Sequence, residues 1–132
     1  MPNVSLKKLK LLYLLQMLWE NTDDQHALTL PRMLEELERL GISAERKSLY
    51  DDIETLRQFG VPIETRKGRT FEYFIAERPF TQSDVHLLAE SVLQAPFLSS
   101  RRAAQLRKKL TLLGSVYQGE QLLQSGGREE PA

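Results

Sequence analysis

A chain of 132 residues is long enough for one domain, or for one domain with a short extension. Its 41% apolar and 27% charged residues exclude a disordered chain, and the absence of cysteine excludes a disulfide framework and a thiolate metal site. Eighteen basic residues balance eighteen acidic ones, so a polyanionic partner would have to bind a local basic patch. A cytoplasmic location fits this composition.

The first predicted helix runs from about Ser5 to Glu20, with Ser5 as its N-cap. Lysines 7, 8 and 10 precede an apolar run, as in a secretory signal. The run is far shorter than the ~20 residues that span a bilayer, so we expect neither a signal nor a membrane helix. We predict a helix that is buried on more than one side. Later helices of the chain or a second copy of the protein would cover the additional side.

A second helix is predicted between Thr29, as N-cap, and Gly41, with Pro31 in its first turn. Its apolar residues recur at helical spacing and predict one buried face. This face consists of Met33, Leu34, Leu37 and Leu40. The two residues before Thr29, Ala27 and Leu28, predict a very short strand.

A third helix is predicted between Ser43, as N-cap, and Gly60, with an inward stripe of Leu49, Ile53 and Leu56. Its exposed charges run opposite to the preference of the helix macrodipole, because the bases come first and the acids one turn later. We infer a partner outside the helix that requires the basic end. The outward residues are Arg46, Lys47, Tyr50, Asp51, Glu54 and Arg57.

Residues 61–76 alternate between apolar and polar on both sides of Gly68, which predicts a β-hairpin. The predicted tip is Arg66-Lys67-Gly68-Arg69. Three basic residues in a four-residue tip suit contact with phosphates better than packing. The alternating residues expected on one side are Ile63, Thr65, Phe71, Tyr73 and Ile75.

Two further helices and a short helical piece follow the hairpin. Thr81 and Asp84 have the spacing of a capping box, and Pro96 ends this fourth helix. The fifth helix opens at Ser99 or Ser100 and ends at Gly114, and the short piece runs through Leu123. We interpret the cations of the fifth helix as a solvated surface or as partners for another protein's acids, rather than as direct DNA contacts. These cations are Arg101, Arg102, Arg107, Lys108 and Lys109.

Three helices followed by a basic-tipped hairpin predict a winged helix-turn-helix. The whole chain is then mainly α with a small β-hairpin and a helical extension. We expect a DNA-binding domain over 1–78, a helical connector and dimerisation region over 79–124, and a disordered tail over 125–132. The start of the third helix would enter the major groove, and the hairpin would contact the backbone or the minor groove. The predicted DNA-binding residues are Ser43, Arg46, Lys47, Ser48, Tyr50, Asp51, Arg66, Lys67, Arg69 and Thr70.

The stretch RKSLYDDIETLRQFGVPIETRKGRTFEYFI, residues 46–75, resembles the N-terminal DNA-binding region of WYL-domain transcriptional regulators, whose winged helix is DeoR-like. Residues 78–115 are similar to the helical connector of a branch of this family, so the resemblance covers about residues 5–123. It implies a sequence-specific DNA-binding transcriptional regulator. The matching residues are Lys47, Ser48, Leu49, Asp52, Ile53, Leu56, Gly60, Tyr73, Phe74 and Ile75.

The chain departs from this family pattern in three ways. Asp51 replaces a common arginine, which removes one expected phosphate contact and offers an acceptor to a cytosine amino group. Glu72 replaces a usual wing glycine. No WYL domain follows the connector, so we expect either a fragment or a naturally short protein, and we assign it no small-molecule effector.

We therefore predict a regulator that binds double-stranded DNA as a homodimer, joined through the first helix and the connector helices, without a cofactor. The alternative is a winged-helix module that binds protein and modulates a full-length regulator. The basic residues of the third helix and the hairpin would then be ordinary solvated charge.

Neither an enzyme nor a metal site is expected. The only two histidines, His26 and His86, are far apart in the sequence, and no catalytic or phosphate-loop motif occurs. The acids Asp51, Asp52 and Glu54 are expected to be solvated or paired with arginine.

Overall fold

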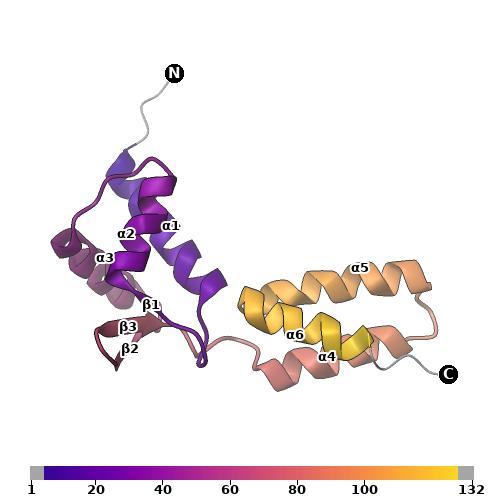
Figure 1. The fold of residues 1–132 in the computed structure, drawn as a ribbon. Coiled ribbons are helices and arrows are strands. Elements are labelled where there is room, and N and C mark those ends of the chain that lie inside the picture. Colours follow the sequence, from indigo (N-terminus) through magenta and orange to yellow (C-terminus); the bar gives the residue numbers. More distant parts are fainter. Residues whose placement is uncertain (1–4, 128–132) are drawn as a thin grey trace. The chain divides into compact units, whose positions relative to one another are not determined.

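The computed structural model describes residues 5–127 (Figure 1). The chain divides into two compact units, residues 1–76 and residues 77–132, which we call unit 1 and unit 2. This division falls two residues before the boundary expected between 78 and 79. Each unit is described separately below.

Unit 1 has the element order of a winged helix-turn-helix. Its strands form one antiparallel sheet in the order β1–β3–β2, and Arg66 lies opposite Glu72 in the hairpin. The predicted fold class is confirmed, because the chain is mainly helical and a winged helix-turn-helix precedes a helical extension. The elements of unit 1 are α1 (Leu6–Asn21), β1 (Leu28–Thr29), α2 (Leu30–Arg39), α3 (Arg46–Phe59), β2 (Glu64–Lys67) and β3 (Phe71–Phe74).

The predicted caps of the first two helices are confirmed, and that of the third is wrong. The hydroxyl of Ser5 accepts a hydrogen bond from the first turn of α1, and that of Thr29 does the same for α2. The helix α3 begins at Arg46 after Glu45, not after Ser43. The side chain of Ile42 is buried in the core, so residues 43–45 are needed to lead the chain outward to the start of α3.

The core of unit 1 joins all three helices to the end of β3, and the predicted stripe of α3 is part of it. One predicted core residue is wrong, since Leu40 is 51% exposed. Gly41 has a φ of 82°, and the N–H of Ile42 donates to the carbonyl of Leu37 at 2.9 Å, so Ile42 turns inward instead. The most fully buried apolar residues of unit 1 are Leu14, Leu18, Met33, Leu37, Leu49, Ile53 and Ile75.

The apolar circumference of α1 is only partly covered by its own chain. Leu11, Leu15 and Trp19 pack against the core of unit 1, whereas Leu12 remains 61% exposed. Unit 1 itself therefore covers much of the additional side of this helix, and Leu12 marks the part that it leaves open.

A buried ion pair fixes α3 to α1. The ammonium group of Lys10 lies 2.9 Å from a carboxylate oxygen of Asp52 and donates a hydrogen bond of 2.5 Å to the hydroxyl of Ser48. The side chains of Lys10 and Asp52 are only 10% and 19% exposed. Because charges removed from water are stable only when they are paired, this contact restricts where α3 can lie on α1.

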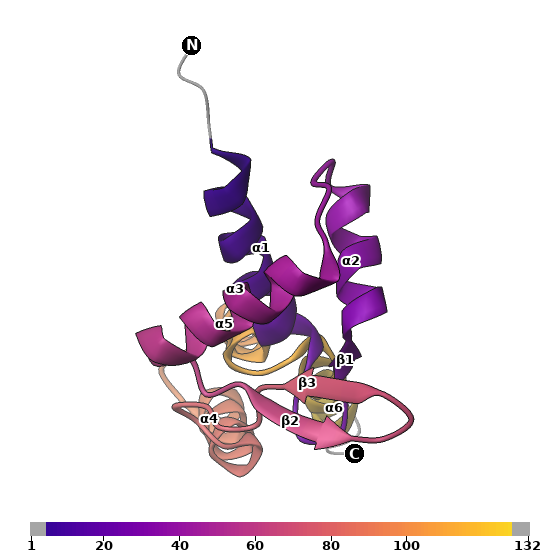
Figure 2. The same ribbon diagram turned by 90° about the vertical axis from the view of Figure 1, so that its left-hand side faces the viewer.

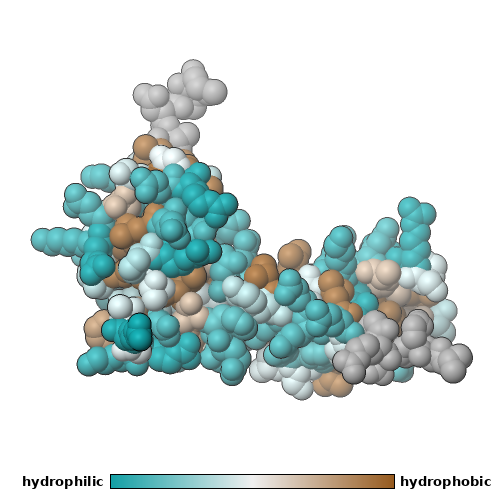
Figure 3. All heavy atoms as spheres, viewed as in Figure 1, coloured by the Kyte–Doolittle hydropathy of each residue, from teal (hydrophilic) through white to brown (hydrophobic). Residues whose placement is uncertain are grey.

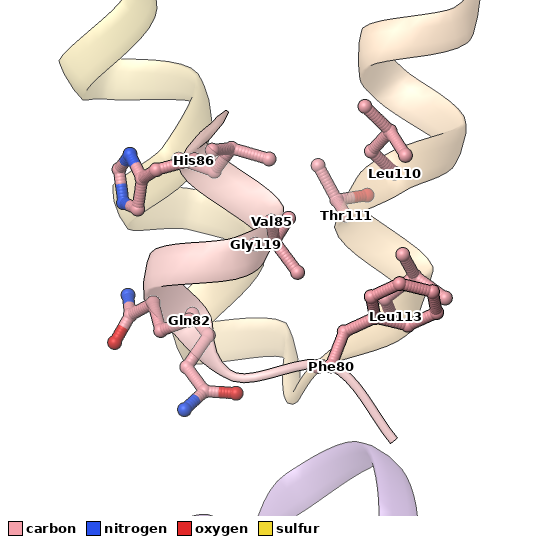
Figure 4. Close-up of a pocket in the computed structure, with 11 residues that line it drawn as sticks. Phe80, Gln82, Val85, His86, Leu110, Thr111, Leu113 and Gly119 are labelled. Atoms are coloured by element: carbon pink, nitrogen blue, oxygen red, sulfur yellow. The ribbon is translucent and has the colours of Figure 1, made fainter. Parts of the chain in front are cut away.

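Unit 2 is a group of three helices that pack around a small apolar core (Figure 4). The capping box of Thr81 and Asp84 is confirmed by two hydrogen bonds of 3.0 Å. Val85, Ala89 and Leu122 form the buried centre. The elements of unit 2 are α4 (Gln82–Gln94), α5 (Ser100–Leu110), the short 3₁₀ helix η1 (Thr111–Leu113) and α6 (Val116–Gly127).

The predicted disordered tail is wrong at its beginning, because α6 continues to Gly127 and includes residues 125–127. The rest of the predicted tail, residues 128–132, lies outside the described residues. Apolar side chains also reach the surface of unit 2, where brown spheres are visible in Figure 3. Phe97, Leu112 and Leu87 are 85%, 74% and 66% exposed. Within the described part of the chain, no helix has both the length and the apolar character required to cross a bilayer.

The buried ion pair predicts a large effect on stability. Replacing Asp52 by alanine leaves the ammonium of Lys10 buried without a counter-charge, and we expect the free energy of unfolding to fall by about 2–4 kcal/mol. Urea denaturation followed by circular dichroism measures this loss. The double variant Lys10→Met/Asp52→Leu, in which both charges are replaced by apolar groups, should recover most of it. A double variant as unstable as Asp52→Ala would contradict this explanation.

Candidate nucleic-acid interface

The first turn of α3 is open to an anion. Glu45 precedes the helix in an extended conformation, and its side chain accepts no capping hydrogen bond. The first N–H groups of a helix have no partner within the helix, and they add to the positive end of the macrodipole. Arg46 and Lys47 are exposed at the same end and form no ion pair with any residue between 5 and 127. The local field at this end of α3 therefore favours a phosphate.

The outward face of α3 carries polar groups at helical spacing. Lys47, Tyr50, Asp51 and Glu54 follow one another at i, i+3, i+4 and i+7, and all four are exposed. Burial raises the pKa of Tyr73, beneath this face, and the nearby hydroxyl of Tyr50 adds to that rise. The face therefore offers donors and acceptors of hydrogen bonds to a partner.

Two of the three acids of α3 are neutralised by cations within unit 1. Asp52 is paired with Lys10, and Glu54 lies 3.6 Å from the guanidinium of Arg57. The carboxylate of Asp51 is exposed and forms no ion pair with any residue between 5 and 127. Asp51 is thus the acid of α3 that remains free to accept from a ligand.

Ser48 and Ser43 differ in how far they are available. The hydroxyl of Ser48 accepts the hydrogen bond from Lys10 and is partly buried, so it helps to position α3. Ser43 is exposed in the loop before α3, and both serines line a groove together with Lys7 and Lys10. Of the two hydroxyls, that of Ser43 is open to a ligand.

The hairpin differs from the prediction in the extent of its tip. Strand β2 continues through Lys67, which pairs with Phe71, so the loop consists of Gly68, Arg69 and Thr70. Cross-strand pairing with Phe71 and Glu72 extends the strand by two residues beyond the expected end. The basic residues are therefore divided between the strand and the loop.

Arg66 is committed to contacts within unit 1. Its Nε lies 3.2 Å from a carboxylate oxygen of Glu72, and its guanidinium lies 4.8 Å from the centre of the Phe74 ring. Its Nη1 also donates a long hydrogen bond of 3.4 Å to the carbonyl of Asp24. Glu72, which stands where the resembling family has a glycine, thus neutralises one of the three predicted cations.

Lys67, Arg69 and Thr70 are exposed at the end of the hairpin. Neither Lys67 nor Arg69 forms an ion pair with any residue between 5 and 127. Within the predicted set, the cations without an internal counter-charge are therefore two on α3 and two on the hairpin. We call Arg46, Lys47, Lys67 and Arg69 the four free cations.

The hairpin and α3 lie on the same side of unit 1 (Figures 1 and 2). In Figure 2 the hairpin runs below α3, and its loop points toward the side where α3 begins. Arg57 connects the two elements, because it donates from Nε to the carbonyl of Ile63 at 2.9 Å and from Nη2 to the hydroxyl of Thr65 at 2.6 Å. The structure therefore holds the two elements that carry the free cations on the same side of unit 1.

Sequence analysis did not predict the roles of Lys10 and Arg57, which position α3 and join it to the hairpin. The Arg66–Glu72 pair was open to prediction, because a three-residue loop places these residues opposite each other in the hairpin. The Lys10–Asp52 pair joins residues 42 positions apart, and no local pattern indicates it.

Among the described residues, the core pocket of unit 2 lacks a set of free polar groups, and no cluster forms a metal site. A small apolar pocket in unit 2 is lined by Phe80, Val85, Leu110 and Leu113, with His86 at its side (Figure 4). It is the packing space between α4, η1 and α6. Three polar residues of its lining already form hydrogen bonds within unit 2, because Gln82 donates to Gln121, Thr111 donates to the carbonyl of Lys108 and Gln118 accepts from the N–H of Ser115. Among the described residues, no group of three or more histidines and acids lies close enough to hold a metal ion.

No family model matches the chain, and no curated protein or solved structure matches it either. The geometry of unit 1 and the sequence motifs therefore carry the functional argument.

The committed and the free arginines of the hairpin should differ in their effect on stability. Replacing Arg66 by glutamine removes an ion pair and a cation–π contact, so we expect the free energy of unfolding to fall by about 1 kcal/mol. The matched variant Arg69→Gln removes the same charge without those contacts and should stay within about 0.5 kcal/mol of the original protein. Thermal and urea denaturation measure both values. Equal losses would show that the Arg66 contacts do not stabilise the hairpin.

Proposed function

We propose that this protein is a sequence-specific DNA-binding transcriptional regulator, or the DNA-binding part of one. In this proposal α3 enters the major groove and the hairpin contacts the backbone or the minor groove. The observation that carries the proposal is that α3 and the hairpin lie on the same side of unit 1 and carry four exposed cations with no ion pair to any residue between 5 and 127. A phosphate backbone supplies the missing negative charge.

The distribution of charges within unit 1 supports a polyanion over general solvation. Arg32, Arg39 and Arg57 are each paired with a glutamate on their own helix, and Lys10 and Arg66 are paired across elements. A chain of zero formal net charge has enough acids to pair its other cations as well. Six cations of unit 1 form no ion pair with any residue between 5 and 127, and four of them are the free cations of α3 and the hairpin. The other two are Lys7 and Lys8 at the start of α1, where Lys7 lines a groove beside the loop that precedes α3.

The resemblance to WYL-domain regulators supports the same proposal from the sequence. The match concerns residue types that the structure uses structurally, such as Asp52 in the ion pair with Lys10 and Gly60 with its φ of 121°. Asp52 positions α3 and Gly60 ends it. The exposed residues beside Asp52 that form no ion pair would contact the DNA bases. We propose membership of this family, with a cytoplasmic location, on the order and spacing of those motifs.

We also propose that the protein acts as a homodimer. Exposed leucines on α1 and α4, Leu12 and Leu87, are 61% and 66% exposed and offer apolar surface for association. A two-fold dimer would place two copies of α3 on two half-sites, which are typically one helical turn of DNA apart.

Salt-dependent binding tests the function. If each of the four free cations neutralises one phosphate, a plot of log affinity against log salt for a duplex of random sequence should have a slope of about −3.6. Fluorescence anisotropy at several salt concentrations measures it. Replacing Arg69 by alanine should make the slope less steep by about 0.9, because one phosphate contact is lost.

The matched control is Arg39→Gln, which removes an exposed charge that is already paired with Glu36 at 3.1 Å. It should leave the slope unchanged. Weak binding with a flat salt dependence, unaffected by Lys47→Ala and Arg69→Ala, would overturn DNA binding. That outcome would favour a module that binds protein and modulates a full-length regulator.

Asp51 should determine the preference for one base pair. A carboxylate is repelled by phosphates, but it accepts a hydrogen bond from the amino group of cytosine in the major groove. Selection from randomised duplexes should therefore enrich one cytosine for the original protein. The variant Asp51→Asn should lose this discrimination, which is typically ~1–3 kcal/mol, about 5- to 150-fold.

Glu54→Gln is the control for this selection, because it changes net charge equally at a carboxylate that is paired with Arg57. It should keep the selected base. If Asp51→Asn tightened binding to every sequence alike, Asp51 would act only by repelling phosphates, and the assignment would be wrong.

A further inference from the structure

The helix α5 in unit 2 carries the most one-sided charge of the molecule. Five of its eleven residues are cations and none is an acid. One cation, Arg107, is used internally, because its Nη2 donates to the carbonyls of Leu122 and Leu123 at 3.1 and 2.7 Å. The other four are exposed and form no ion pair with any residue between 5 and 127. They are Arg101, Arg102, Lys108 and Lys109.

These four cations share the outer face of α5, where hydrophilic side chains project in Figure 3. Ala103 is buried at the opposite face, with Leu106, Arg107 and Leu110 partly buried around it. Arg101 and Lys108 are seven residues apart, as are Arg102 and Lys109, so each pair spans two turns, or about 10 Å. The result is two pairs of cations on one face of a straight helix.

The two arginines at the start of α5 are unfavourable for the helix itself. Arg101 and Arg102 occupy the first turn of α5, at the positive end of the macrodipole, where an acid would be preferred. Lys108 and Lys109 lie in the last turn, and the dipole accounts for them. The helix macrodipole therefore favours the positions of the two lysines but not those of the two arginines. The arrangement repeats that of α3, which also begins with two unpaired cations.

We propose that the outer face of α5 is a second contact surface for nucleic-acid phosphates, on the same duplex that α3 and the hairpin bind. The proposal rests on the proposed function and extends it to unit 2. The site would take backbone phosphates without regard to base sequence, because long flexible cations on a convex helix suit charge contact rather than base readout.

The composition of this face favours phosphate over an acidic protein surface. Protein interfaces are enriched in aromatic residues and depleted in lysine, whereas this face holds two lysines and no aromatic residue. Gln105 lies between the arginines and the lysines and accepts a hydrogen bond of 3.3 Å from Nη1 of Arg102, and Leu112 is an exposed apolar residue at the end of the face. Charge complementarity thus points to a polyanion.

Attachment to unit 1 makes a weak contact effective. A ligand already bound by one unit is presented to the other at a local concentration in the millimolar range for a short linker. The last strand of unit 1, β3, ends at Phe74, and the first helix of unit 2, α4, begins at Gln82, so only seven residues lie between these two elements. Four exposed cations would then add affinity without requiring strong binding of their own.

The test compares DNA length dependence for the full chain. We would measure affinity for duplexes of about 12, 20 and 30 base pairs, or one to three helical turns, with the same central sequence. The original protein should bind the longest duplex at least ~5-fold more tightly than the shortest, with a steeper salt slope. The variant Arg101→Gln/Arg102→Gln should lose this gain, and its slope on the long duplex should be less steep by about 1.8, as for two lost phosphates. Its melting temperature should not fall, because the substitution relieves the macrodipole.

The matched control is Arg32→Gln/Arg39→Gln, which removes two cations seven residues apart that are paired with glutamates on α2. It should retain the gain with length. If the original protein and Arg101→Gln/Arg102→Gln gained equally, or if the original protein did not gain, the contact by α5 would be overturned. Failure of the proposed function would be distinct, since the shortest duplex would then bind without dependence on Lys47 and Arg69.

Discussion

The ammonium group of Lys10 lies between Ser48 and Asp52, and the orientation of α3 in unit 1 depends on this contact. If apolar packing were the only contact between α3 and α1, leucine and isoleucine side chains would tolerate small rotations and shifts of α3. A buried charge pair does not, because a rotation would separate the ammonium from its carboxylate in a poorly solvated place. The contact thus determines which residues of α3 face outward, and so selects Lys47, Tyr50 and Asp51 for the exposed face.

A second consequence concerns which charges remain available. Internal pairs remove Lys10, Arg57 and Arg66 from the set of cations that could bind a ligand, and they remove Asp52, Glu54 and Glu72 from the set of acids. A basic residue that is only exposed is therefore a weak indication of ligand binding. An exposed basic residue with no ion pair, beside acids that are already paired with other cations, is a stronger indication. By this criterion Arg66 is a structural residue and Arg69 is a candidate for binding. Arg66 stabilises the hairpin, and Arg69 would contact the partner.

The sequence predicted most of the fold because its signals are local. Thr29, Gly41 and Gly60 mark helix ends by their own backbone chemistry, and the spacing of Leu49, Ile53 and Leu56 shows the inward face of α3 directly. The errors arose where a distant contact decided the outcome. Ser43 is a good N-cap residue by type, but the burial of Ile42 delays the start of α3. No local sequence pattern predicts the hydrogen bond from Lys10 to Ser48 either, since it depends on how α1 crosses α3.

The zero formal net charge limits how such a protein can bind a polyanion. Long-range attraction is weak when the charges of the whole molecule cancel, so affinity must come from short-range contacts at places where cations are locally in excess. Four free cations on unit 1 would supply only a few phosphate contacts, whereas strong salt-dependent binding usually involves six to ten or so. Either a second copy of the chain or a second basic surface on the same chain would make up the difference, and the outer face of α5 is the part of unit 2 with the charge to do so. Unit 2 would then add phosphate contacts as well as any surface for association, which would give a role to the four cations of α5 that form no ion pair with any residue between 5 and 127.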